Sequence, residues 1–343
     1  MTETELKNLL KTVAPPDEAA RAAAHAHWAA LAKPLGGLGQ LETMVEAAAA
    51  LTGDPAPDFT RRAVLVLCAD NGVVAQGVSQ TDASVTRAVL ENLTARRTSV
   101  CCMAAAAHCE VVPVDMGIAG VSVPGAVDRR VAPGTRDFTQ GPAMTREQAV
   151  QAVAAGIELL ATGEMGIGNT TTSSAVAAVL LGRPAAEMTG RGAGLSDEGL
   201  HRKIHAIERG IAVNHPNAAD PLGVLTALGG FDIAGLCGVF LGGALEKIPV
   251  IMDGFISGVA ALCAVRLCPA AAKAVFASHA SSEPAARLVL NALHKKPLIT
   301  ADLHLGEGTG AVASLPLWDM ALAVYNHCYS FTEGGIAPYT PQC

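Results

Sequence analysis

Short apolar runs that alternate with alanine-rich stretches constrain the fold of this chain most strongly. The Val-, Leu- and Ile-rich runs are predicted as strands and the stretches between them as helices. Continuous apolar strands between helices are typical of a parallel sheet covered on both faces, so we expect an α/β fold. The predicted strands are residues 62–70, 110–117, 249–255, 274–279 and 298–308, while residues 158–166 end as a strand or a turn.

The composition agrees with that fold and excludes other classes. Hydrophobic residues make up 50% of the 343 residues but aromatic residues only 3%, so Ala, Val and Leu must fill the core. A net charge of −7 without any basic run argues against nucleic-acid binding. The polar N-terminus is unlike a signal peptide, and the longest apolar runs, such as 235–245, are too short to span a bilayer. We therefore expect a cytoplasmic protein with no membrane partner.

Nine cysteines occur without a CxxC pair, and several lie in apolar stretches. We expect them to be reduced and buried, where a cysteine behaves as a small hydrophobic residue. A metal or redox site is the alternative.

Most of the predicted strands run into an acidic residue followed closely by glycine. In an open parallel sheet the carboxyl ends of the strands share one edge, and ligands bind there. An Asp-Gly pair is also an ordinary turn, but its recurrence predicts a shared site. The stretches are Asp70-Asn71-Gly72, Asp115-Met116-Gly117, Asp253-Gly254 and Glu307-Gly308.

Two glycine-rich loops are candidates for phosphate binding. The stretch GEMGIGNTTTSSAV, residues 163–176, leads into a predicted helix whose N-terminus and hydroxyl groups suit a phosphate. It is neither a P-loop nor GxGxxG, and a well-capped helix start is the simpler explanation. In GRGAGLSDEGLHRKI, residues 190–204, Ser196 is a predicted N-cap and Lys203 lies two turns further on. Lys203 either faces solvent or projects toward a phosphate.

A metal site is a weaker possibility. The ten histidines show no HxH or HExxH spacing. Asp70, Asp115 and Asp253 could collect a divalent metal, which would make the protein a metal-dependent phosphohydrolase or a kinase-like enzyme. Nothing in the sequence fixes their mutual geometry.

Eight stretches together resemble a known family, the nicotinate-nucleotide:dimethylbenzimidazole phosphoribosyltransferases. They follow the family order from Lys33 to Ala311, so the resemblance covers most of the chain. They are KPLGGLGQLE, CADNGVVAQGVS, GEMGIGNTTTSSA, GRGAGLSDEGL, GGFDIAGLCG, PVIMDGFISGVAAL, SHASSEP and LGEGTGA.

The resemblance implies a Rossmann-like large domain, residues 31–314, and a small helical domain built from residues 1–30 and 315–343. It implies a homodimer that needs no metal and no cofactor. It also implies the reaction: a base nitrogen attacks C1′ of nicotinate mononucleotide, nicotinate leaves, and an α-ribotide forms with inversion during assembly of the cobamide nucleotide loop.

The resemblance further assigns roles to residues that match the family motifs. Glu307 is the general base and Glu164 supports the site. The phosphate and nucleotide region comprises Gly166, Gly168, Asn169, Thr170, Gly190, Arg191, Lys203 and Ser281. The base pocket comprises Asp70, Ser79, Gln80, Met165 and Leu305.

The chain departs from the family pattern at several positions of these loops. Asn71 stands where the family usually has His, Gln80-Thr81-Asp82 stands where it often has Tyr-Pro or a similar pair, and Ala193 replaces a usual Thr. The first two departures leave the acceptor open: dimethylbenzimidazole, another benzimidazole, a purine or a phenol. A non-catalytic nucleotide-binding paralogue that needs a partner subunit is a further alternative.

Overall fold

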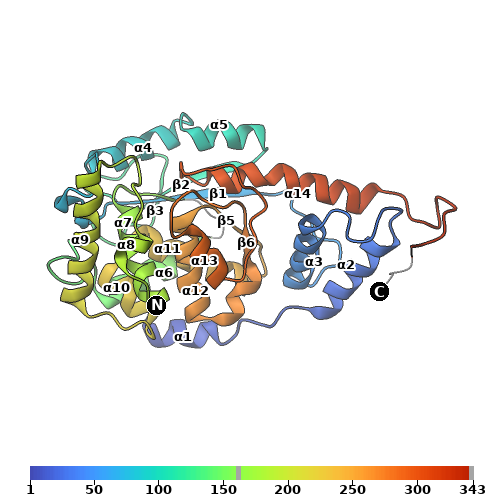
Figure 1. The fold of residues 1–343 in the computed structure, drawn as a ribbon, viewed down its shortest axis with the longest axis horizontal. Coiled ribbons are helices and arrows are strands. Elements are labelled where there is room, and N and C mark those ends of the chain that lie inside the picture. The colour runs from blue at the N-terminus through green and yellow to red at the C-terminus, as the bar shows by residue number, and fades with distance from the viewer. Residues whose placement is uncertain (160–163, 340–343) are drawn as a thin grey trace.

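The computed structural model of the chain describes residues 1–159 and 164–339 and has an α/β fold (Figure 1). One parallel sheet has the strand order β3-β2-β1-β4, and a second parallel sheet pairs β5 with β6. The prediction of parallel strands between helices is thus confirmed. The strands are β1 (Ala63–Ala69), β2 (Glu110–Gly117), β3 (Val127–Asp128), β4 (Glu164–Met165), β5 (Val250–Met252) and β6 (Val275–Ala277).

The strand predicted over residues 298–308 was wrong. Only Ile299 pairs there, in a single bridge to His279. Further along, Asp302 (φ +51°), Gly306 (φ +90°) and Glu307 (φ +60°) adopt left-handed backbone conformations, which a strand cannot contain. Residues 160–163, within the segment predicted to end as a strand or a turn, lie outside the described residues, and β4 is its described end.

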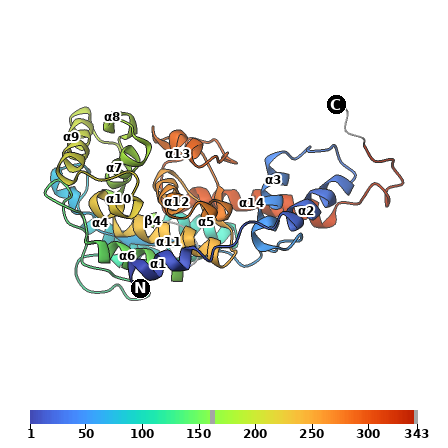
Figure 2. The same cartoon turned by 90° about the horizontal axis from the view of Figure 1, so that it is seen from below.

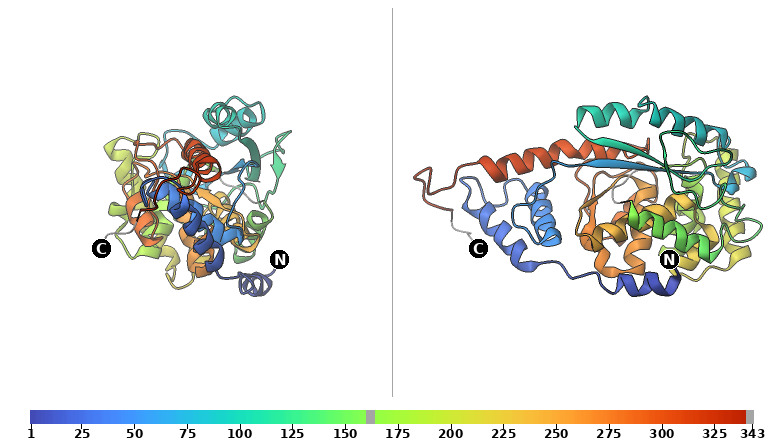
Figure 3. Two further views of the ribbon diagram at one scale, coloured as in Figure 1. Left: turned by 90° about the vertical axis from the view of Figure 1, so that its right-hand side faces the viewer. Right: turned by 180° about the vertical axis from the view of Figure 1, so that it is seen from behind.

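Helices cover both faces of the main sheet. Helices α4 and α5 pack on β2 from one side and α11 packs on β1 and β2 from the other (Figures 1 and 3). The α-helices are α1 (Glu3–Leu10), α2 (Glu18–Ala30), α3 (Gln40–Thr52), α4 (Ser84–Thr94), α5 (Ser99–Ala106), α6 (Arg146–Glu158), α7 (Asn169–Leu181), α8 (Ala185–Met188), α9 (Asp197–Asn214), α10 (Pro221–Leu228), α11 (Phe231–Leu245), α12 (Phe255–Leu267), α13 (Ala286–Ala292) and α14 (Thr309–His327). Two 3₁₀ turns, Gly72–Gln76 and Pro269–Ala274, complete the set.

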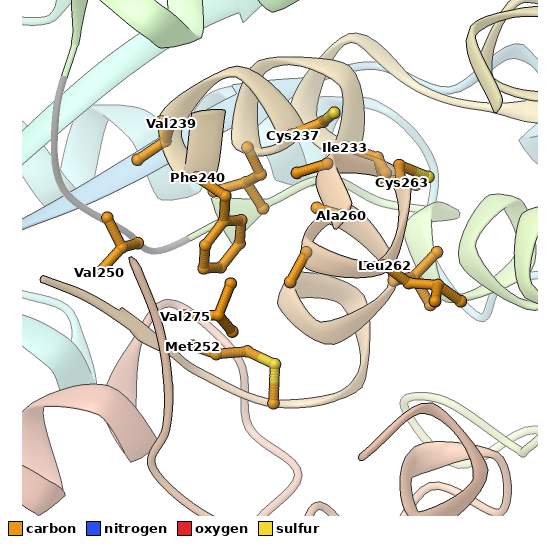
Figure 4. Close-up of a cluster of buried hydrophobic side chains, with 14 of the residues drawn as sticks. Ile233, Cys237, Val239, Phe240, Val250, Met252, Ala260, Leu262, Cys263 and Val275 are labelled. Carbon is orange, nitrogen blue, oxygen red and sulfur yellow. The ribbon is translucent and has the colours of Figure 1, made fainter. Parts of the chain in front are cut away.

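Strand β1 divides its side chains between two hydrophobic cores. Val64, Val66 and Cys68 join the smaller core, whereas the alternating Leu65, Leu67 and Ala69 join the larger one. Successive side chains of a strand point to opposite faces, so a strand that is apolar throughout must be covered on both. Figure 4 shows part of the larger core, where Phe240, Val250 and Met252 meet residues of α12. The eight described cysteines are free, and five of them are buried, as expected.

Glycines allow helices α6 and α11 to cross at backbone contact. A Cβ atom on Gly156 would lie 1.8 Å from the carbonyl oxygen of Gly235, and one on Gly238 would lie 2.0 Å from that of Val153. Such close approach suits a core with few aromatic side chains. Because α11 also packs on β1 and β2, this crossing fixes the position of the sheet relative to α6.

Helices α2 and α3 meet the C-terminal part of the chain at one end of the molecule, away from the N-terminus (Figures 1 and 2). Leu31 pairs with Ser330 in an antiparallel bridge, and the ring of Trp28 packs edge-on against Tyr325 at 4.8 Å. Helices α2 and α3 lie beside the C-terminal half of α14 (Figures 1 and 2). Helix α1 lies against α6 in the main body, where Arg146 binds Glu3 at 2.6 Å. The predicted domain boundaries, 1–30 with 315–343 and 31–314, stay a prediction.

Among the described residues, no helix is both long enough and apolar enough to cross a bilayer.

Gly156→Ala should destabilise the fold by about 3 kcal/mol, the upper end of the usual range for overpacking, because backbone at the crossing cannot move aside. Gly258→Ala is the matched control in helix α12. A Cβ there would meet only side-chain atoms, the nearest 3.1 Å away. Thermal unfolding of both variants tests this, and equal loss of stability in the two would contradict the account of the crossing.

Candidate active site

A cavity of about 200 Å³ lies where loops after four parallel strands converge with the start of α14. This is the carboxyl edge of the strands. Of the four acid-glycine stretches predicted to share a site, Asp253-Gly254 and Glu307 line the cavity, whereas residues 70–72 and 115–117 do not. The cavity is lined by Val78, Ser79, Gln80, Gly166, Ile167, Gly168, Asn169, Thr170, Arg191, Gly192, Ala193, Leu195, Lys203, Asp253, Gly254, Phe255, Ile256, His279, Ser281, Glu283, His304, Leu305, Gly306, Glu307 and Thr309. We call it the edge cavity below.

The N-terminus of helix α7 points into the edge cavity. Helix α7 begins at Asn169, and no side chain caps it at Gly168. A Cβ atom on Gly166 would lie 2.8 Å from the carbonyl oxygen of Ala69, so glycine lets this loop pack against the end of β1. The positive end of the helix dipole and the hydroxyl of Thr170 therefore face the cavity, an arrangement that suits a phosphate.

Lys203 of helix α9 is fully buried beside the same helix end. Its ammonium donates hydrogen bonds to Thr170 Oγ1 at 2.9 Å and to the carbonyl oxygen of Gly190 at 3.0 Å. An ammonium has three N–H donors, so one is left for a ligand. Burial lowers the pKa of Lys203 to about 8, and the carboxylate of Glu283 opposes this. Of the two alternatives left by the sequence, the solvent-facing one is wrong.

The other residues predicted for the phosphate region surround Lys203. Arg191 lines the edge cavity and forms an ion pair with Asp197 on the exposed side. Ser281 also lines the cavity. Gly190 does not line it: its carbonyl holds Lys203, and a Cβ atom there would lie 2.0 Å from Glu283 Oε2.

Two loops meet over the cavity at Gln80. Its side-chain amide donates a hydrogen bond to the carbonyl oxygen of Gly194, which joins the loop after β1 to the loop before α9. Ser79 and Gln80 line the cavity, as does Leu305, which is 56% exposed at its rim. Their predicted role in binding the base stays a prediction.

Glu307 occupies a left-handed turn directly before helix α14. Its φ is +60°, and its neighbours Gly306 and Gly308 have φ values of +90° and +85°. A non-glycine residue in this region is uncommon and is often found at functional sites. Glu307 lines the edge cavity, and its Oε2 accepts a hydrogen bond from the backbone N–H of Val100 at 3.2 Å.

Asp253, at the end of β5, fixes this turn. Its Oδ1 accepts hydrogen bonds from the backbone N–H groups of Gly310 at 2.7 Å and Ala311 at 3.0 Å. Helix α14 has no side-chain cap from its own N-cap residue, Gly308, so Asp253 caps it from a distant part of the chain. The start of α14 and the Glu307 turn are thereby held against the end of β5.

His279 is a cavity residue that the sequence did not reveal as such. Its ring packs against Gly310, where a Cβ atom would lie 2.0 Å from His279 Nδ1. Its Nδ1 is 3.0 Å from Ser278 Oγ, and burial lowers the pKa of the imidazole. The only available signal was its place in the SHASSEP stretch after a strand.

Besides Gly190, three predicted site residues are not placed in the cavity. Asp70 is buried next to it, where its Oδ2 accepts a hydrogen bond from the N–H of Ala119 at 2.9 Å, and burial raises the pKa of this carboxyl. The backbones of Glu164 and Met165 form β4, but their side chains lie outside the description. Their roles stay predictions.

The three aspartates of the metal hypothesis already form hydrogen bonds or ion pairs within the protein. Asp115 Oδ2 pairs with Arg130, while its Oδ1 accepts from Gly117 and Ile118. Asp253 caps α14, and it alone of the three lines the edge cavity. No group of three or more His, Cys, Asp or Glu residues in the described ranges is placed to hold a metal ion. In the described residues, the three aspartates are therefore not arranged around a common metal position.

Comparison with known proteins gives a consistent result. A family model described as "Phosphoribosyltransferase" matches residues 13–336. The chain is 44% identical to the nicotinate-nucleotide–dimethylbenzimidazole phosphoribosyltransferase of Acetivibrio thermocellus, across 91% of this chain and 92% of that protein. It is 43% identical to the protein of the same name from Chloroflexus aggregans, across 97% and 98% of the two chains.

A solved structure agrees at the level of the fold. The crystal structure of CobT from Thermus thermophilus matches with a TM-score of 0.88 and 40% sequence identity. The match covers 93% of this chain and 99% of that one.

Lys203→Met should weaken binding of a ribonucleoside monophosphate by about 10- to 100-fold, the range expected for losing a hydrogen bond to a charged group. In the wild type, affinity should fall as pH rises through about 8, because Lys203 loses its charge there. Isothermal titration calorimetry from about pH 6.5 to 9.5 measures both effects.

Lys295→Met is the matched control. Burial also lowers the pKa of Lys295 to about 8, but its ammonium binds the carbonyl oxygen of Ala272 and does not line the edge cavity. Its affinity for the nucleotide should equal that of the wild type. Equal losses of nucleotide affinity in the two variants would show that Lys203 affects affinity by stabilising the fold and not by contacting the ligand.

Proposed function

Because this chain belongs to the nicotinate-nucleotide–dimethylbenzimidazole phosphoribosyltransferase family, we propose that it transfers the phosphoribosyl group of nicotinate mononucleotide to an aromatic base. The products are nicotinate and an α-ribotide, the precursor of the lower ligand of a cobamide. Glu307 acts as the general base of this reaction.

The observation that carries the proposal is the arrangement of opposite charges across one cavity. Lys203, Arg191 and the N-terminus of α7 line the cavity and form its cationic wall, to which the carboxylate of Glu283 lies close, and Glu307 lines the same cavity. The cationic wall suits the phosphate of the nucleotide. The carboxylate suits a neutral base that must lose a proton. Both substrates then lie in one cavity, with C1′ between the phosphate and the base.

The reaction needs one proton acceptor. One ring nitrogen of a benzimidazole attacks C1′ with its lone pair, while the N–H proton of the other passes to Glu307. The bond from C1′ to nicotinate breaks, and its electron pair neutralises the cationic ring nitrogen. Nicotinate therefore leaves without an acid catalyst. Attack from the face opposite to nicotinate inverts C1′, and positioning of the two bound substrates supplies much of the acceleration.

Glu164 is proposed to support the site, as the resemblance implies. Its backbone pairs with Leu67 of β1, directly before the phosphate loop that begins at Gly166. No metal ion and no cofactor enter the proposed reaction.

The identity of the base depends on the loop after β1 and its neighbours. Of the positions that depart from the family pattern, Gln80 and Ala193 line the edge cavity. Asn71 lies beneath it, where its amide donates to the carbonyl oxygen of Ile167. Asp82 accepts a hydrogen bond from the N–H of Ser84 near the start of α4. We propose dimethylbenzimidazole as the acceptor, with other benzimidazoles, purines and phenols as competitors to be ranked.

A homodimer in the cytoplasm is the proposed state of the protein. Large apolar side chains are exposed on the loop before α3, on α14 and on the C-terminal segment, which favours contact with a second copy. They are Leu35, Met320, Tyr329, Ile336 and Tyr339.

The direct test incubates the purified chain with nicotinate mononucleotide and an equimolar mixture of dimethylbenzimidazole, benzimidazole, adenine and phenol. Mass spectrometry identifies each ribotide, and the nicotinate released gives total turnover. The main product should be the dimethylbenzimidazole ribotide, with activity unchanged by EDTA. Activity lost to EDTA and restored by Mg²⁺ would favour the metal-dependent alternative, and no nicotinate release with any base would favour the inactive paralogue.

Glu307→Gln should lower kcat by about 100-fold or more, because general base catalysis contributes roughly 10²–10⁴-fold. The affinity for nicotinate mononucleotide should stay within about twofold, since the phosphate wall is intact. Glu187→Gln, at an exposed ion pair with Arg183, controls for the substitution itself. If Glu307→Gln turns over at the wild-type rate, another group accepts the proton.

A further inference from the structure

We propose that the backbone N–H of Val100, in the first turn of helix α5, is a positioning group for Glu307. It holds one oxygen of the carboxylate before the substrates bind. Helix α5 lies outside the edge cavity, so this assigns a role in the reaction to an element that never touches the substrates. The inference rests on the proposed role of Glu307 as general base.

The contact joins two parts of the chain that are 207 residues apart. Val100 N–H donates to Glu307 Oε2 at 3.2 Å, and helices α5 and α14 pack together. Val100 is fully buried and does not line the edge cavity, whereas Glu307 does. The glutamate side chain therefore reaches from the cavity wall back to the start of α5.

Helix α5 lacks a local cap that would compete for this carboxylate. The first N–H groups of a helix have no acceptor within the helix. The N-cap residue, Thr98, accepts no hydrogen bond from them, and its hydroxyl lies 3.3 Å from the sulfur of Cys101 instead. Glu307 takes the place of the missing cap, and the positive end of the helix dipole favours its negative charge.

The hydrogen bond orients the proton acceptor. With Oε2 held by Val100, Oε1 is the oxygen left to accept a proton from the incoming base. The backbone of Glu307 is fixed by its left-handed turn and by the Asp253 cap on α14, so both ends of the side chain are restrained. A glutamate has three side-chain torsions, and fixing them in advance removes an entropic cost from the reacting complex.

Val100→Pro removes this N–H. Proline is tolerated in the first turn of a helix because the N–H it lacks has no helical partner. We expect kcat to fall about 10- to 100-fold, the scale expected from small misplacements of catalytic groups, with KM for nicotinate mononucleotide within about twofold. Ser99→Pro controls for a proline in this turn, because it leaves the Val100 N–H in place. Ser99 is exposed whereas Val100 is buried, so the loss of buried side-chain packing needs a separate control.

A double-mutant cycle separates positioning from damage to the fold. In the Glu307→Gln background, Val100→Pro should cause no further loss of kcat, because the carboxylate it positions is absent. The proposal is overturned if Val100→Pro lowers kcat by the same factor in both backgrounds, or if Ser99→Pro and Val100→Pro are equally impaired.

Hydrogen exchange tests the contact without reference to activity and without a proline. Since Val100 N–H has no acceptor within α5, its protection should come from Glu307. In Glu307→Ala the Val100 amide should exchange at least about tenfold faster, while amides in the last turn of α5 keep their rates. Unchanged exchange at Val100 would refute the contact. If Glu307→Gln turns over at the wild-type rate, the proposed role of Glu307 as general base is wrong. Hydrogen exchange still tests the contact with Val100 in that case.

Discussion

The geometry of the site depends on one buried carboxylate that caps a helix from far along the chain. Asp253 ends strand β5, and its Oδ1 accepts the N–H groups of Gly310 and Ala311 at the start of α14. These two hydrogen bonds hold the glycine-rich turn before α14 at the carboxyl edge of the sheet. With this cap, Glu307 is held at the edge cavity, and α14 continues from there to the end of the molecule formed by α2 and α3.

In the proposed function, the edge cavity combines two kinds of chemistry. The N-terminus of α7 and the buried Lys203 are proposed to bind an anion, which would offset the cost of burying the lysine. The carboxylate of Glu307, held by a glycine turn and a backbone N–H, is proposed to accept a proton. The established likeness to phosphoribosyltransferases of the dimethylbenzimidazole type agrees with this combination.

The sequence predicted the parts of this structure that local patterns encode. Apolar runs and their acid-glycine ends identified the parallel strands and their shared edge, and Ser196 was rightly predicted as the N-cap of α9. The strand predicted over residues 298–308 was wrong because an apolar pattern does not reveal which residues adopt a left-handed conformation. The role of Asp253 as a cap and the contact from Val100 depend on residues 57 and 207 positions away, so no local pattern could reveal them.

A crystal structure of Glu307→Gln with nicotinate mononucleotide and dimethylbenzimidazole bound together would test the central claim most directly. The account predicts the phosphate at the N-terminus of α7 beside Lys203. It also predicts a benzimidazole nitrogen within about 2.6–3.2 Å of the side chain at position 307. A phosphate bound elsewhere, or a benzimidazole nitrogen that faces a different side chain, would contradict it.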